Sequence, residues 1–291
     1  MESSELLKRV RKIEIKTRGL SAQVFSGEYH SAFKGRGMAF SEVREYIPGD
    51  DIRSIDWNVT ARFNHPYVKI FEEERELTVM LLVDVSASGN FGTRQQFKRD
   101  LITELSAVLA FSAIENNDKT GVILFSDKIE LFIPPKKGKT HILRIIRELV
   151  NLEPSGKGTD INQALRYFNN MIKKRCIAFV ISDFMNAGYG DAIKVASKKH
   201  DLAAIRVYDP REAEMPDLGL VRFTDAESGQ TSLLDSGNAN VRRDYQIWFK
   251  QTQAQTTELL NKCGVDHATI RTDQPYVQPL INLFKKRERR A

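Results

Sequence analysis

The stretch "TVMLLVDVSASGNFG", residues 78–92, decides the fold. Its first half is an almost unbroken apolar run, which is typical of a β-strand covered on both faces. The run ends abruptly in Asp84, Ser86 and Ser88, one carboxylate and two hydroxyls at alternate positions. A serine nucleophile, a metal site and a plain turn are three explanations for these side chains.

After this strand the chain alternates short apolar runs with segments of helical periodicity. Further strands are expected over residues 119–127, 175–184, 201–209 and 265–273. Helices are expected over residues 97–118, 139–152, 160–174, 191–200, 240–263 and 275–288. Residues 128–135 suggest an edge strand or hairpin partner, and residues 219–236 a hairpin with Gly229 in its turn. This alternation predicts an α/β fold with a mostly parallel, Rossmann-like sheet flanked by helices.

Residues 1–75 do not follow the alternation, so we divide the chain there and assign residues 76–291 to the α/β domain. The first segment begins with a basic amphipathic pattern, and "YIPGD", residues 46–50, places Pro48 and Gly49 as a type II turn requires. Charged side chains gather in sequence around Trp57: Glu45, Asp50, Asp51, Arg53, Asp56 and Arg62. We interpret them as an ion-pair network. A small β-containing subdomain and an arm over the α/β domain are both compatible with this segment.

The composition is that of an ordinary water-soluble protein, with 41% apolar and 28% charged residues among 291. No window approaches the roughly 18 apolar residues of a spanning helix, and the charged N-terminus lacks the apolar region of a signal peptide. We therefore expect a cytoplasmic protein with two reduced cysteines, Cys176 and Cys263. The net charge of +6 includes the basic end "KKRERR", residues 285–290. Without interleaved aromatic residues, we interpret this end as a solvated helix terminus and expect no nucleic-acid partner.

Two later loops carry oxygen-bearing side chains that belong with Asp84 if the strands are parallel. Thr159 lies in "GKGTD" just before a helix, and Asp183 ends the strand "AFVIS". The carboxyl ends of parallel strands meet at one edge of a sheet, where ligands bind. Asp160 is expected to cap the following helix, which leaves Thr159 free. Oxygen ligands suit hard cations such as Mg²⁺.

A serine nucleophile is disfavoured at the same place. A nucleophile elbow needs G-x-S-x-G and a histidine base, and the window "VSASG" around Ser86 lacks the first glycine. The five histidines are scattered, and none follows a late strand as a catalytic base would. Turn chemistry explains the serines alone but leaves Thr159 and Asp183 without a reason.

The ordered set D-x-S-x-S, a threonine before a helix and a strand-ending aspartate resembles the metal-ion-dependent adhesion site (MIDAS) of von Willebrand factor A domains. The resemblance implies that Mg²⁺ or Mn²⁺ is held by five residues: Asp84, Ser86, Ser88, Thr159 and Asp183. It also implies that a carboxylate from a partner protein completes the coordination.

Residues 33–88 resemble the diagnostic segment of a bacterial family catalogued as domain of unknown function 58, through "REYIPGDD", "RSIDWN" and "TAR". Members carry a von Willebrand factor A-like domain and are commonly encoded beside MoxR-type AAA+ ATPases; some carry two membrane spans before this segment. The resemblance implies a non-enzymatic, metal-dependent protein-interaction module, an adaptor that works with a MoxR-type ATPase. A metal-dependent hydrolase with Asp183 or Asp160 as base, and a nucleic-acid-binding protein, are the alternatives.

Overall fold

The computed structural model describes residues 10–14, 16–17, 39–63, 65–72, 77–92 and 96–288. Contacts group the chain into two compact units, one made of Met1–Phe33 and Thr78–Ala291 and the other of Lys34–Leu77. The sequence placed residues 1–75 together, whereas the helical residues 10–14 and 16–17 fall in the larger unit.

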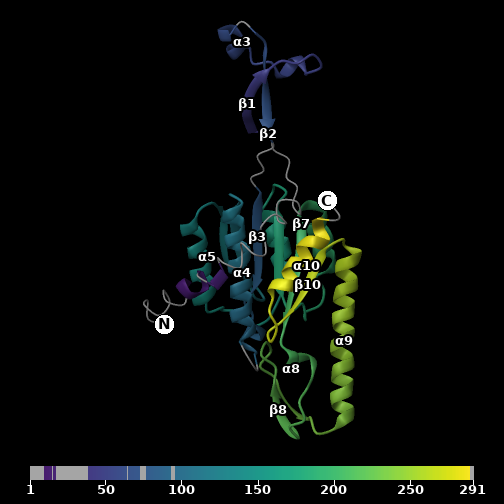
Figure 1. Ribbon diagram of the computed structural model, residues 1–291. Helices are drawn as coiled ribbons and strands as arrows, with labels where there is room; N and C mark the ends of the chain where they lie inside the picture. Colours follow the sequence, from purple (N-terminus) through teal and green to yellow (C-terminus); the bar gives the residue numbers. More distant parts are fainter. Residues whose placement is uncertain are drawn as a thin grey trace. The chain divides into compact units, whose positions relative to one another are not determined.

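The larger unit is built on one six-stranded sheet (Figure 1). Its strands, in spatial order, are β10 (Asp266–Arg271), β7 (Asp201–Tyr208), β6 (Ile177–Ser182), β3 (Thr78–Asp84), β4 (Lys119–Phe125) and β5 (Ile129–Lys136). All neighbouring pairs are parallel except β4 and β5, which pair antiparallel. The expected α/β fold with a mostly parallel sheet is therefore confirmed, and residues 128–135 supply the antiparallel edge.

Helices cover both faces of this sheet. They are α4 (Lys98–Glu115), α5 (Lys139–Asn151), α6 (Ile161–Met171), α7 (Gly190–Lys199), α9 (Ala239–Lys262) and α10 (Val277–Glu288). Met80 and Leu82 of β3 join a core cluster with α6 and α7, and Phe179 of β6 meets Phe284 of α10 with ring centroids 6.2 Å apart. Residues 79–83 are completely buried, which explains their unbroken apolar run.

A hairpin lies beyond the carboxyl-end edge of the sheet, beside the first turns of α9 (Figure 1). It consists of β8 (Leu220–Thr224) and β9 (Thr231–Asp235), paired antiparallel. Gly229 occupies the turn with φ +70°, a conformation that glycine adopts without strain, as the sequence predicts. The short helix α8 (Pro210–Ala213) precedes the hairpin and begins with a capping box from Asp209 and Glu212.

The smaller unit pairs β1 (Ala39–Glu45) with β2 (Tyr67–Glu72) and adds the 3₁₀ turn η1 (Ile52–Ser54) and helix α3 (Trp57–Phe63). The predicted turn is present, because Asp50 N donates to Ile47 O at 3.0 Å and Gly49 has φ +115°. Two members of the charged cluster, Asp50 and Asp56, form ion pairs, but their partners lie outside the cluster. Arg44 holds Asp50 at 2.7 Å through two nitrogens, and Lys69 lies 3.6 Å from Asp56.

The C-terminal helix α10 contains part of the basic end, which is not solvated throughout as the sequence led us to expect. Arg287 is 6% exposed and lies 3.3 Å from Asp266 in an ion pair. Residues 289–291 lie outside the described residues. Across the described ranges, no helix is both long and apolar enough to cross a bilayer.

Candidate metal centre

Asp84 is the last residue of β3 and is only 5% exposed. Its Oδ2 accepts a hydrogen bond from Ser182 Oγ at 2.6 Å, and its Oδ1 accepts one from Ser86 N at 3.0 Å. Ser182 ends β6, the parallel neighbour of β3. The carboxylate is therefore fixed by both strand ends, at the edge where the sequence places a ligand site.

The two serines and Asp183 join Asp84 as predicted. Ser86 Oγ and Ser88 Oγ lie 3.0 Å apart, and Ser88 Oγ donates to Asp183 Oδ2 at 3.0 Å. This bond joins residues 95 positions apart in the chain. Asp183 Oδ1 accepts from Met185 N at 3.1 Å, which fixes the second carboxylate. Four of the five predicted ligands thus form one cluster at two adjacent strand ends.

The backbone after Asp183 is held in a costly conformation. Phe184 has φ +56°, a left-handed value that costs a non-glycine residue about 1–2 kcal/mol. Its ring is 1% exposed and packs against Tyr189 with centroids 5.9 Å apart, and its N–H donates to Ser182 Oγ at 3.1 Å. Burial of the ring offsets the backbone cost, so the core of the domain orients the Asp183 carboxylate.

Thr159 lies on the neighbouring loop, where its side chain makes an unpredicted contact. Asp160 caps α6 by accepting from Gln163 N at 2.8 Å, as the sequence predicts. Thr159 O accepts from Asn186 Nδ2 at 3.2 Å, which ties this loop to the one after β6. Thr159 Oγ1, however, donates to Glu227 Oε1 at 2.7 Å, in the turn of the β8–β9 hairpin.

Sequence reasoning missed Lys98. This side chain is 1% exposed, and its Nζ lies 2.9 Å from Asp183 Oδ2 and 2.6 Å from Glu212 Oε1. Burial lowers the pKa of Lys98, but the attraction of Asp183 and Glu212 outweighs it and raises the pKa above its usual value. A signal was available, because Lys98 opens α4, where the helix dipole disfavours a cation.

Comparison with known proteins assigns the family. The family model described as "Protein of unknown function DUF58" matches residues 42–255. This chain belongs to the DUF58 family. It is 29% identical over 294 aligned positions to the "Uncharacterized protein Rv1480" of Mycobacterium tuberculosis, with 100% of this chain and 92% of that protein covered.

Solved structures support the fold of this DUF58 chain. An aerotolerance-related membrane protein from Bacteroides fragilis superposes with a TM-score of 0.51 at 19% identity, covering 74% of this chain and 100% of that one. The SpRpn10 VWA domain matches with a TM-score of 0.38 at 11% identity, covering 72% and 95%. The larger unit has the mostly parallel α/β sheet that the sequence predicts, and the Bacteroides fragilis protein shares this fold.

The DUF58 site carries more negative than positive charge. Lys98 contacts the carboxylates of Asp183 and Glu212 directly. Two further carboxylates, those of Asp84 and Glu227, belong to the same site. Burial and repulsion from Asp183 raise the pKa of Asp84 to about 7. Burial also raises the pKa of Glu212. A site whose carboxylates resist ionisation is one that an added cation would stabilise.

The donor set fits a hard divalent cation. The four clustered side chains supply two carboxylates and two hydroxyls, the oxygen ligands that Mg²⁺ and Mn²⁺ prefer. Together with Lys98 they line a cavity of about 10 Å³, which is room for about one water molecule or ion. Thr159 is not among the described residues that line it. Among the described residues, no three His, Cys, Asp or Glu side chains are placed to hold a metal by themselves. The hydroxyls are therefore indispensable to any such site, and Lys98 Nζ already contacts Asp183 Oδ2 at 2.9 Å.

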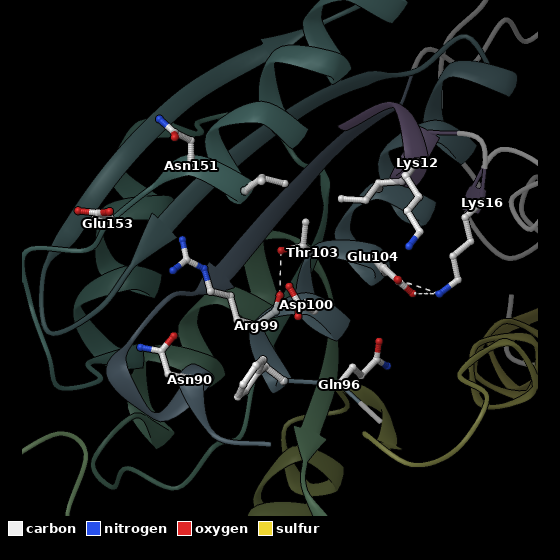
Figure 2. A pocket seen from close by; sticks show the side chains of 13 residues that line it. Lys12, Lys16, Asn90, Gln96, Arg99, Asp100, Thr103, Glu104, Asn151 and Glu153 are labelled. Atoms are coloured by element: carbon white, nitrogen blue, oxygen red, sulfur yellow. Dashed lines mark hydrogen bonds and ion pairs between the residues drawn. The ribbon is translucent and has the colours of Figure 1, made fainter. Parts of the chain in front are cut away.

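A separate pocket of this DUF58 chain lies away from the candidate metal centre. Figure 2 shows a cavity of about 570 Å³ beside α4, lined by Lys12, Lys16 and Glu104 among others. Lys16 Nζ reaches Glu104 Oε2 at 2.6 Å across it. None of the five predicted metal ligands is among its lining residues in the described part of the chain. Positive and negative side chains both line this pocket, and Lys16 is already paired with Glu104, so the lining does not select one class of ligand.

Proposed function

We propose that this DUF58 protein is a metal-dependent protein-interaction module. Mg²⁺ or Mn²⁺ is held by Asp84, Ser86, Ser88, Thr159 and Asp183, and a carboxylate of a partner protein fills the remaining position. The observation that carries the proposal is the Ser88–Asp183 hydrogen bond, which brings the D-x-S-x-S loop and the end of β6 into one site. A bound cation would neutralise these buried carboxylates, which outnumber the positive side chains beside them.

The chain's own residues have separate tasks in this proposal. Asp84 and Asp183 supply charge, and the hydroxyls of Ser86, Ser88 and Thr159 supply neutral ligands. Ser182 orients Asp84 through its 2.6 Å hydrogen bond, so it is a positioning residue. Two carboxylates leave a divalent cation formally neutral, and a partner carboxylate then binds by direct coordination with little competing charge.

The direct test is calorimetric titration of Mn²⁺ and Mg²⁺ into wild type, Asp84→Asn and Asp160→Asn. Both variants lose one carboxylate at the same edge, but Asn remains a good helix cap at position 160. We expect wild type and Asp160→Asn to bind alike and Asp84→Asn to bind at least about 10-fold more weakly. Equal binding by all three would remove the proposed site.

We further propose that the protein acts in the cytoplasm as a non-enzymatic adaptor of a MoxR-type AAA+ ATPase. Chelation is a poor test of this pairing because the ATPase itself needs Mg²⁺ with its nucleotide. Co-sedimentation of the purified ATPase with wild type, Asp84→Asn and Asp160→Asn at constant Mg²⁺ avoids that difficulty. Loss of co-sedimentation with Asp84→Asn alone is the expected result, and equal recovery of all three variants contradicts metal-gated pairing.

The hydrolase alternative has fewer free groups than the sequence suggested. Asp160 Oδ1 is occupied by the cap of α6, and both oxygens of Asp183 accept hydrogen bonds. A general base needs a free oxygen within reach of the attacking water. We therefore favour binding over hydrolysis as the role of this site.

A further inference from the structure

The turn of the β8–β9 hairpin presents one side chain to the site. Residues 222–226 and 228–233 are exposed, whereas Glu227 between them is only partly exposed. Its Oε1 accepts the 2.7 Å hydrogen bond from Thr159 Oγ1, across 68 residues of sequence. Its other oxygen, Oε2, lies 3.8 Å from the position that a Cβ on Gly158 would take, so the carboxylate sits directly over the loop that carries Thr159.

The turn is built to hold Glu227 in this place. Asp225 Oδ1 accepts from Glu227 N at 2.9 Å and from Ser228 N at 2.6 Å, and the backbone closes with Gly229 N to Asp225 O at 2.9 Å. The base of the hairpin is fixed by Ser236 N, which donates to Gly219 O at 2.8 Å. A carboxylate delivered by such a tight turn loses little conformational freedom when it binds.

The Glu227 carboxylate is held in this place by a hydroxyl, which carries no net charge. The Asp84 and Asp183 carboxylates belong to the same proposed site. A divalent cation among these oxygens would attract the Glu227 carboxylate far more strongly than a hydroxyl does.

We propose that Glu227 is a built-in carboxylate that occupies the partner position of the metal site, so that the hairpin closes the site until a partner's carboxylate displaces it. This inference rests on the proposed metal-dependent function. It identifies the resting occupant of the site as part of the same chain. It also makes release of the β8–β9 hairpin a step in partner binding.

The test uses Mn²⁺ alone as the probe on the full chain. Water-proton relaxation counts the exchangeable waters on bound Mn²⁺, and paramagnetic resonance of free Mn²⁺ gives its affinity. The variants are Glu227→Gln and, as a matched control on the same hairpin, Asp235→Asn. We expect Glu227→Gln to gain exchangeable water on the ion and to bind Mn²⁺ about 10- to 100-fold more weakly, with the control unchanged.

Hydrogen exchange gives a second readout that does not depend on affinity. Saturating Mn²⁺ should slow exchange of the backbone amides of residues 224–231 in wild type and in Asp235→Asn but not in Glu227→Gln. Equal water number and equal protection in Glu227→Gln and wild type would overturn this inference while the metal site stands. Absence of Mn²⁺ binding by wild type would overturn both the proposed function and this inference.

Discussion

Replacement of Lys98 by Met removes the ammonium that holds the site together without metal. Lys98 is 1% exposed and contacts Asp183 and Glu212, whose side chains are 7% and 21% exposed. Removing one member of a buried ion pair costs about 3–5 kcal/mol. Asp183 keeps its bonds from Ser88 and Met185, and Glu212 can be partly rehydrated, so we expect a loss of about 3–4 kcal/mol. For a unit of this size each kcal/mol lowers Tm by about 2–4 °C, so the expected decrease is roughly 6–16 °C.

Metal should reverse much of this loss, because a divalent cation supplies the missing charge. A ligand at 100 times its Kd stabilises the folded state by about 2.7 kcal/mol. In wild type, a cation at the proposed site would compete with Lys98 Nζ, which lies 2.9 Å from Asp183 Oδ2. Differential scanning calorimetry in EDTA and in graded Mg²⁺ should therefore show a larger Mg²⁺-induced rise of Tm in Lys98→Met than in wild type.

Two comparisons make the Lys98 result interpretable. Lys194→Met, on the exposed side of α7, should change stability by less than about 0.5 kcal/mol. Glu212→Gln combined with Lys98→Met removes one carboxylate together with its ammonium, so the double variant should be more stable than the sum of the single losses. Unchanged Tm of Lys98→Met in EDTA would refute the ion-pair role, and equal Mg²⁺ effects in wild type and Lys98→Met would refute competition for Asp183.

Three further outcomes follow from individual residues. The pKa of Asp84 is raised to about 7, so the folded state holds a proton that the unfolded chain releases near pH 4. Without metal, the free energy of unfolding should therefore fall by up to roughly 4 kcal/mol as the pH rises from 4 to 7. Chemical denaturation at a series of pH values should show this fall in wild type and a flatter dependence in Asp84→Asn. Asn117 follows the C-cap of α4 and has φ +57°, so Asn117→Gly should keep or slightly raise Tm, whereas Asn117→Ala should cost about 1 kcal/mol. Burial raises the pKa of the Cys176 thiol to about 12, so a disulfide reagent at pH 8 should label the half-buried Cys263 first, and equal labelling rates would contradict the packing around Cys176.

The sheet was predictable because each strand carries its own signal. β3 and β6 are buried on both faces, so their sequences are apolar at every position between their ends, and this pattern needs no knowledge of the rest of the chain. The turn at Pro48 and Gly49 and the cap at Asp160 are equally local. Elements of this kind are encoded within a few residues, which is why they are readable from one sequence.

The four clustered ligands were predictable for a related reason. Parallel strands place their carboxyl ends at one edge, so Asp84 and Asp183 were expected at the same edge once the strands were recognised. The structure adds that β3 and β6 are neighbours, which brings the two residues close together. No comparable rule of sheet geometry predicts that Lys98, Glu212 and Glu227 lie at this site. Glu212 has an ordinary local explanation as a capping residue and Glu227 as a turn residue, whereas Lys98 carries only the weak signal of a cation at a helix start. Only the packing of α4, α8 and the hairpin brings these residues to the site.

These unpredicted residues suggest how the resting site is complemented from within the chain. Lys98 places a positive charge against Asp183, as a bound cation would, and Glu227 places a carboxylate against Thr159, as a partner would. Each internal group interacts more weakly than the group it stands in for. The Lys98 ammonium carries one positive charge where a divalent cation carries two, and Glu227 is held by a neutral hydroxyl where a partner carboxylate would bind the metal. If the proposed site binds metal, the cation would displace Lys98 from Asp183 and strengthen the hold on Glu227. Metal affinity and partner access would then be thermodynamically coupled through the same few oxygens.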